Sequence, residues 1–162
     1  MPDAIFEDPR LAAVYDPLDP DRSDLDVYVA IAAELDARFV LDVGCGTGTF
    51  ALLLADRDLE VAAVDPALAS LDVARAKPGA ERVRWLHGDA TSLPPLQVDL
   101  ATMTANVAQA IVRAAEWHGT LAGHPQRPAF QRPARLRDAR PGEARASDRP
   151  GREFVFFATR AD

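Results

Sequence analysis

The sequence predicts one α/β domain built on a doubly wound, mostly parallel sheet that is incomplete on its C-terminal side. Short apolar strands alternate with helices over residues 23–121, which is typical of right-handed βαβ units and a parallel sheet. Three glycines follow the first of these strands closely. The alternation then stops, and a long proline-rich segment stands where a fifth strand is expected. A chain of 162 residues is long enough to bury one hydrophobic core.

Two helices are expected before the first strand. Residues 2–20 are acidic and rich in proline, with a short helical stretch around residues 11–15. The next helix is predicted to start at Ser23, whose hydroxyl suits an N-cap, with aspartates near the positive end of the helix dipole. Its apolar residues recur at helical spacing, at Leu25, Tyr28, Val29, Ala32 and Leu35.

The elements of the sheet region follow from apolar runs and from residues that break helices. Strands are predicted at residues 39–43, 59–64, 83–86 and 98–103. Helices are predicted at residues 49–55, 67–76 and 106–121. Pro78 and Gly79 end the second of these helices, and Gly119 interrupts the third.

The chain is predicted to divide into three parts. Residues 1–121 form the core with an N-terminal cap, residues 122–152 an irregular segment, and residues 153–162 a terminal strand containing EFVFFAT. Residues 124–152 hold eight arginines and five prolines but only three acidic residues, a composition that predicts a loop or disorder. Two origins stay open. Residues 124–145 are translated out of frame in a shortened, GC-rich gene, or they form a natural basic loop that orders on an acidic partner or substrate.

Composition and charge exclude several classes of protein. The formal net charge of −7 argues against a general binder of nucleic acid or anionic membranes. Cys45 is the single cysteine, so no internal disulfide is possible and no metal site is indicated. No apolar run approaches the roughly 18 residues of a spanning helix, and no secretory signal is recognised. We therefore expect a cytoplasmic protein without nucleic-acid or membrane partners, whose oligomeric state stays open.

The most informative segment is VLDVGCGTGTFALLLA, residues 40–55. Here a strand runs into Gly44, Gly46 and Gly48, and a helix follows. Glycine accepts positive φ and lets a ligand approach the backbone, and the amides at a helix start can receive a polar group. A dinucleotide fingerprint would need glycine where Thr49 stands, so the spacing disfavours a nicotinamide cofactor. The structural alternative is a tight turn whose glycines serve packing alone.

With Asp42 before the glycines, the segment reads D-x-G-x-G-x-G. This pattern resembles motif I of the class I S-adenosylmethionine-dependent methyltransferases, and the resemblance extends over residues 5–121. It implies a Rossmann-like core, S-adenosylmethionine as the cofactor, and contact between Asp42 and the amino group of the methionine moiety. The fifth strand that this family has after residue 121 is missing from the pattern.

Two further carboxylates stand at strand ends. Asp65 ends the strand in VAAVDP, seventeen residues after Gly48, where a carboxylate can accept hydrogen bonds from ribose hydroxyls. The resemblance implies that Asp89, in HGDATSLP, accepts from the adenine amine and that the Ala90 amide meets a ring nitrogen. The alternatives are a helix cap for Asp65 and an ordinary loop aspartate for Asp89.

The acceptor side carries fewer signals. Open α/β sheets bind ligands at the carboxyl ends of their strands, which makes Thr104 and Asn106 candidates after the fourth strand. Tyr15 stands in VYDPLDPDRSD, which resembles the N-terminal cap of small-molecule methyltransferases, so it could cover the ligand. A polar loop with a helix cap, and a surface helix, are the alternatives. Cys45 is expected to pack, and no catalytic base is assigned.

These observations predict an S-adenosylmethionine-dependent methyltransferase that acts on a small-molecule acceptor. The acceptor class rests on the resemblance and on the acidic charge. The main alternative is an inactive or binding-only remnant that lacks an acceptor site, which the missing fifth strand favours. A nicotinamide oxidoreductase is the third possibility, and the glycine spacing disfavours it. Ligand choice separates the third from the others, and turnover separates the first from the second.

Overall fold

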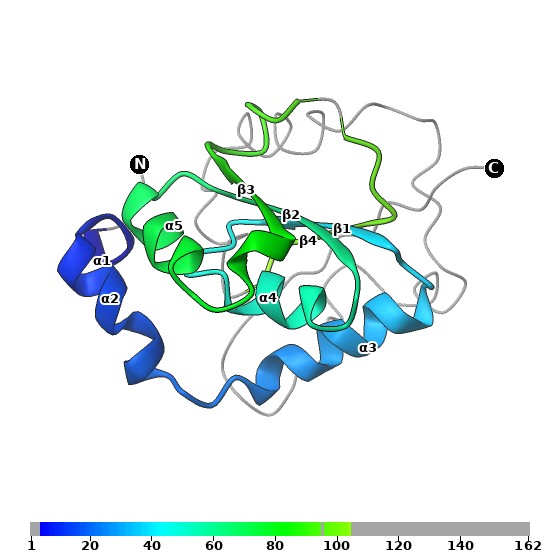
Figure 1. The fold of residues 1–162 in the computed structure, drawn as a ribbon, viewed down its shortest axis with the longest axis horizontal. Coiled ribbons are helices and arrows are strands. Elements are labelled where there is room, and N and C mark those ends of the chain that lie inside the picture. The colour runs from blue at the N-terminus through cyan, green and yellow to red at the C-terminus, as the bar shows by residue number, and fades with distance from the viewer. Residues whose placement is uncertain (1–3, 95, 105–162) are drawn as a thin grey trace, which may run out of the picture.

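A computed structural model describes residues 4–94 and 96–104 of the chain. Its centre is a four-stranded, fully parallel sheet (Figure 1). The strands are β1 (Phe39–Val43), β2 (Glu60–Asp65), β3 (Val83–His87) and β4 (Leu100–Thr102), in the spatial order β3-β2-β1-β4. All four strands lie at the predicted positions, and the alternating parallel arrangement confirms the predicted fold class.

Helices precede the sheet and connect its strands. Those in the described residues are α1 (Ala4–Glu7), α2 (Pro9–Leu18), α3 (Asp26–Glu34), α4 (Thr49–Ala55) and α5 (Leu68–Arg75). Short 3-10 turns cover Ser23–Leu25 and Ala80–Arg82. α2 is longer than predicted, because the Asp8 carboxylate caps it by accepting from the Arg10 amide at 2.9 Å. α1 and α2 lie beside α5 at one end of the molecule (Figure 1).

Local sequence explains where these elements begin and end. β1 reads FVLDV and is buried along almost its whole length, as expected of a parallel strand covered on both faces. α5 ends shortly before Pro78, which cannot continue a helix, and Gly79, whose φ is 81°. The predicted stop of this helix is therefore confirmed.

The start of α3 differs from the prediction, because Ser23 does not cap it. Ser23 opens a 3-10 turn, and α3 begins at Asp26 with Leu25 at its N-cap and no side-chain cap. The Asp26 amide donates to the Ser23 carbonyl, and the Ser23 amide donates to the Asp21 carboxylate at 3.1 Å. The tight turn thus satisfies an amide that the predicted cap would have served.

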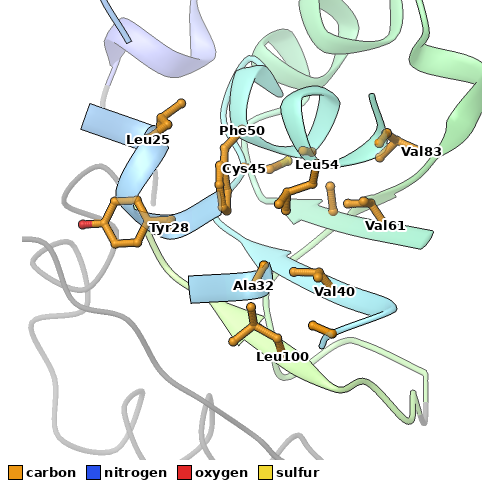
Figure 2. Packing of buried hydrophobic residues seen from close by; sticks show 14 of the residues in the cluster. Leu25, Tyr28, Ala32, Val40, Cys45, Phe50, Leu54, Val61, Val83 and Leu100 are labelled. Atoms are coloured by element: carbon orange, nitrogen blue, oxygen red, sulfur yellow. The ribbon is translucent and has the colours of Figure 1, made fainter. Parts of the chain in front are cut away.

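Alternate residues of each strand face opposite sides of the sheet. On one side, Val40 and Val61 pack with residues of α3, α4 and α5, among them the fully buried Leu54 (Figure 2). Tyr28 of α3 meets Phe50 of α4 edge to face, with ring centroids 6.0 Å apart. Burial of one such leucine stabilises the fold by roughly 2 kcal/mol, so this cluster fixes both helices against the sheet.

The opposite side of the sheet carries a second apolar cluster, formed by Leu41, Val43, Ala62, Val64, Ala90, Ala101 and Met103. Within residues 4–94 and 96–104, this cluster draws on strands and loops and on none of the helices. The helices that pack on the sheet in this part of the chain, α3 to α5, therefore cover one face.

Several predictions concern residues outside the described part of the chain. These are the helix at 106–121, the irregular segment at 122–152, the strand in 153–162 and the candidate residue Asn106. The division into three parts stays a prediction for the same reason. Across the part of the chain that is described, no helix is long and apolar enough to cross a membrane.

Candidate functional site

The predicted cofactor residues lie at or near the carboxyl ends of the strands. β1 pairs with β2 on one side and with β4 on the other, so the strand order changes direction at β1. Open parallel sheets bind ligands at this point. The glycine loop, residues 44–48, follows β1 here, and Asp65 ends β2 beside it. The topology thus places both predicted motifs at one sheet edge.

The three glycines of the glycine loop have positive φ, 73° at Gly44, 53° at Gly46 and 78° at Gly48. A Cβ on Gly48 would lie 2.5 Å from the Trp85 ring and 2.8 Å from the Ala74 Cβ, so packing requires this glycine. A Cβ on Gly46 would meet nothing within 4 Å, so the backbone there is open to an approaching group. Packing therefore explains why residue 48 is glycine. It does not explain the glycine at position 46, where the open backbone could receive a ligand.

Asp42, which precedes the glycine loop, is only 1% exposed. Its Oδ1 accepts a hydrogen bond from the Thr102 hydroxyl at 3.2 Å, whereas its Oδ2 is buried and has no partner within the described residues. Burial raises the pKa of Asp42 to about 7, although the Thr102 hydroxyl and the Arg22 charge oppose the rise. A buried acceptor without a donor costs roughly 1–3 kcal/mol, and a cationic donor at this place would remove that cost.

Asp65 is also buried, but both of its oxygens have partners. Oδ2 accepts from the Gly46 amide and Oδ1 from the Ala67 amide, each at 2.7 Å. Burial raises the pKa of Asp65, and these two amides oppose the rise. The carboxylate therefore ties the glycine loop to Ala67, the residue before α5, and it does not cap the helix, because the N-cap of α5 is Ala67 and has no side-chain cap. Each oxygen keeps a second lone pair, so the predicted ribose contacts stay possible.

Asp89 is exposed and shapes its own loop. Its Oδ1 accepts from the Thr91 amide at 2.9 Å and from the Ser92 amide at 3.2 Å, an Asx-type turn. The Thr91 hydroxyl also donates to it and lowers the pKa of Asp89. Ala90 is buried in the second apolar cluster. The ordinary loop role is thus present, and the adenine contacts of Asp89 and Ala90 stay predictions.

Three further residues discussed in the sequence analysis, Tyr15, Thr104 and Cys45, lie within the described part of the chain. Tyr15 is partly buried and packs on Phe6, with ring centroids 5.5 Å apart. Thr104 follows β4 and is 5% exposed. Cys45 belongs to the first apolar cluster, and burial raises the pKa of its thiol well above the usual value, which fits packing better than nucleophilic chemistry. The contacts with an acceptor that the sequence suggests for Tyr15 and Thr104 stay predictions.

Sequence reasoning missed a polar network around Asp16 of α2. Asp16 Oδ1 accepts from the Thr47 hydroxyl at 2.6 Å and from the Thr49 hydroxyl at 3.3 Å. Its Oδ2 lies 2.5 Å from Lys77 Nζ, which also donates to the Thr49 hydroxyl at 3.1 Å. We call these four residues the Asp16 network. The one available signal was composition, because Lys77 is the single lysine of the chain.

A second missed residue is Arg22, which precedes α3. Its side chain is 18% exposed, and its Nε donates to the Asp24 carboxylate at 3.3 Å. Its charge acts on Asp42 and lowers the pKa of that carboxyl. Arg22 therefore adds positive potential to the edge where Asp42 and Asp65 place negative charge, and its place in an irregular stretch offered no motif.

The family of the chain follows from comparison with known proteins. Residues 40–123, slightly more than half of the chain, match a family described as a methyltransferase domain. This chain belongs to that methyltransferase domain family. The match begins in β1 and includes the glycine loop, Asp65 and Asp89, so the resemblance to the class I methyltransferases is confirmed.

Curated relatives resemble parts of the chain. The biotin biosynthesis bifunctional protein BioHC of Cellvibrio japonicus is 44% identical over 64 residues, which cover 40% of this chain and 12% of the relative. The cypemycin N-terminal methyltransferase of a Streptomyces species is 38% identical over 80 residues, which cover 49% of this chain and 33% of the relative. The chain thus spans a third or less of the length of these relatives.

Solved structures share the fold. S-adenosylmethionine-bound CalS10, an amino pentose methyltransferase from Micromonospora echinaspora, superposes with a TM-score of 0.54 at 27% identity, over 64% of this chain and 46% of CalS10. An S-adenosylmethionine-dependent methyltransferase from Clostridium acetobutylicum gives 0.58 at 22% identity, over 70% and 50% of the two chains. The second likeness concerns the fold alone.

The family makes S-adenosylmethionine the cofactor, and the residues present fit it. Among residues 4–94 and 96–104, no donor reaches the buried Asp42 Oδ2, which suits the ammonium group of the methionine moiety. The open backbone at Gly46 leaves room for close approach to the glycine loop. Both features belong to this chain, and both suit the cofactor that the family assignment implies.

Proposed function

We propose that this chain is an S-adenosylmethionine-dependent methyltransferase acting on a small-molecule acceptor in the cytoplasm. The observation that carries the proposal is Asp42, a buried carboxylate with one oxygen that has no partner among the described residues, placed two residues before Gly44 of a glycine loop that leaves Gly46 open. A structural carboxylate would have its partners within the fold. The acceptor oxygen of Asp42 that the described residues leave unfilled lies at the edge where such sheets bind ligands.

Each proposed residue has one task in holding the cofactor. Asp42 accepts from the methionine ammonium, and Gly46 admits the cofactor against the backbone. Asp65 accepts from the ribose hydroxyls through its remaining lone pairs. Asp89 and the Ala90 amide meet the adenine edge. The bound cofactor supplies the electrophilic methyl group, so the protein contributes binding, alignment and electrostatics.

The acceptor side is proposed from position and from relatives. Thr104 follows β4 at the edge that holds Asp42, and Tyr15 lies in α2 next to Asp16 of the Asp16 network. Asn106 completes the proposed set. CalS10, at 27% identity, is an amino pentose methyltransferase, which supports a small-molecule acceptor here. The net charge of −7 disfavours nucleic acid as the acceptor.

A binding-only chain is the second candidate. The observation that favours it is the proline-rich sequence of residues 122–152, which stands where the sequence pattern of the family leads us to expect a fifth strand. A chain that retains the cofactor residues and lacks an acceptor site would bind S-adenosylmethionine without turnover.

Methyl transfer from labelled S-adenosylmethionine tests the proposal. The purified chain is incubated with a panel of amino sugars and other small amines, and label transfer is followed by mass spectrometry. Transfer that an Asp65→Ala variant loses would support the enzyme. Tight binding of S-adenosylhomocysteine with no transfer to any acceptor would instead support the binding-only candidate.

A further inference from the structure

The Asp16 network joins three segments that are far apart in the sequence. The first segment is α2, the second is the glycine loop with the first residue of α4, and the third is the stretch after α5. We propose that Asp16 is a positioning residue for cofactor binding, which holds the glycine loop through the hydroxyls of Thr47 and Thr49. The inference rests on the proposed function, since it takes the glycine loop as the cofactor site.

The glycine loop needs such a hold. Three residues with positive φ and no side chain give this segment high conformational entropy before folding. The structure restrains it from two sides: Asp65 binds the Gly46 amide at 2.7 Å, and Asp16 binds the hydroxyl of the next residue, Thr47, at 2.6 Å. Thr47 is 4% exposed, so water does not readily replace this contact.

Lys77 keeps Asp16 in its accepting form. The Lys77 side chain is 24% exposed and the Asp16 side chain 30%, so the ion pair is partly shielded from solvent. Burial acts to raise the pKa of Asp16, but Lys77 and the threonine hydroxyls hold it below its usual value. Asp16 is therefore ionised at neutral pH and accepts from Thr47, Thr49 and Lys77 together.

The network links α2 to the cofactor site but leaves α1 attached elsewhere. α1 is held on α5 by the Ser70 hydroxyl, which donates to the Phe6 carbonyl at 2.9 Å. Asp16 lies in the last turn of α2 and contacts the glycine loop directly. A ligand that fixes the glycine loop should therefore strengthen the docking of α2, and docked α2 should strengthen ligand binding by the same factor.

Calorimetric titration with S-adenosylhomocysteine tests the proposal. We expect Asp16→Asn to weaken binding about tenfold, the scale of one lost charged hydrogen bond. Asp19→Asn is the control, because it removes one negative charge next to the same helix end and is exposed. The control should bind within about twofold of the wild type. Lys77→Gln should weaken binding, whereas Lys77→Arg, which keeps the positive charge, should bind as the wild type does.

Amine labelling provides a readout that a purely structural role would not move. Lys77 is the single lysine, so an amine-reactive reagent followed by peptide mapping reports this side chain alone. S-adenosylhomocysteine should slow labelling of Lys77 in the wild type and in Asp19→Asn, and should not slow it in Asp16→Asn. If Asp16→Asn fails to fold cooperatively, Thr47→Val removes the same hydrogen bond from the other side and should weaken binding equally.

The outcomes are separable. Equal affinity in Asp16→Asn and Asp19→Asn, or labelling of Lys77 that the ligand leaves unchanged in the wild type, would overturn the positioning role. A wild type that binds no S-adenosylhomocysteine would overturn the proposed function itself, and the inference with it.

Discussion

Asp42 is the last residue but one of β1 and Asp65 is the last residue of β2, yet their surroundings give them different roles. Asp65 has an amide on each oxygen, so it is part of the fold whether or not a ligand binds. Asp42 has the Thr102 hydroxyl on one oxygen, and its second oxygen has no partner in the part of the chain that the structure describes. The burial of Asp42 therefore destabilises the fold, and a cationic ligand that donates to this carboxylate would offset the loss.

The first prediction concerns the stability of Asp42→Asn. The pKa of Asp42 rises from 3.8 to about 7 on folding, so between these pH values the folded chain holds a proton that the unfolded chain has released. The free energy of unfolding therefore falls as the pH rises through this window, and it levels off above the window. The total loss that Asp42 causes is about 4 kcal/mol. Asp42→Asn should remove that loss, so urea unfolding at pH 8 should show it to be more stable than the wild type.

The same variant should lose the ligand. An ammonium group favours ionised Asp42, so wild-type affinity for S-adenosylhomocysteine should decrease below pH 7, and Asp42→Asn should bind weakly at every pH. Titrations at pH 6 and pH 8 check this. A variant that is less stable than the wild type at pH 8 and still binds would contradict both the stability and the binding predictions.

The second prediction separates two glycines of the glycine loop. Gly48→Ala should destabilise the fold by about 2 kcal/mol or more, because its Cβ would overlap the Trp85 ring and φ is 78°. Gly46→Ala has room for its Cβ and should cost about 1 kcal/mol through its positive φ, yet it should impair ligand binding. Unfolding and titration together decide this, and the reverse ranking in stability would refute it.

At the scale of elements, α1 and α2 are attached to the core by different polar contacts. The third prediction is that Ser70→Ala lowers the free energy of unfolding by about 1 kcal/mol. Ser70 is fully buried, and the variant lacks the hydroxyl that donates a hydrogen bond to the Phe6 carbonyl. Affinity for S-adenosylhomocysteine should stay unchanged, because α1 does not contact the glycine loop through this bond. A large loss of affinity would show that α1 also supports the site.

Strands and connecting helices could be predicted because their signals are local. β1 and β2 are short apolar runs, and Pro78 with Gly79 marks the end of α5. The cap at Ser23 was predicted wrongly, since the 3-10 turn that replaces it depends on Asp21 and on backbone geometry. Sequence patterns predict the existence of a helix or strand better than they predict the geometry at its ends.

The candidate site could be predicted only in part, for the same reason. The order Asp42, glycine loop, Asp65 lies within one βαβ unit, so spacing alone exposes it. The bond between Asp16 and Thr47 joins residues 31 positions apart, and no periodicity relates them. Arg22 acts on Asp42 through its charge, and this effect also has no sequence signature.

At the scale of the whole molecule, all proposed cofactor residues lie within the described part of the chain, before residue 104. The fourth prediction is that a chain ending at residue 121 binds S-adenosylhomocysteine as the full chain does, since it keeps β1 to β4 and the Asp16 network. Titration of both lengths measures this. A folded short chain with no affinity would show that later residues complete the cofactor site.

The most direct test of the account is thermal unfolding of the purified chain with S-adenosylmethionine, S-adenosylhomocysteine and NAD in parallel. A ligand at about a hundred times its dissociation constant adds roughly 2.7 kcal/mol to stability, which corresponds to a shift of several degrees. We predict this shift with the two adenosyl ligands and none with NAD. A cooperative transition that neither adenosyl ligand moves would contradict the claim that Asp42 and the glycine loop form a cofactor site.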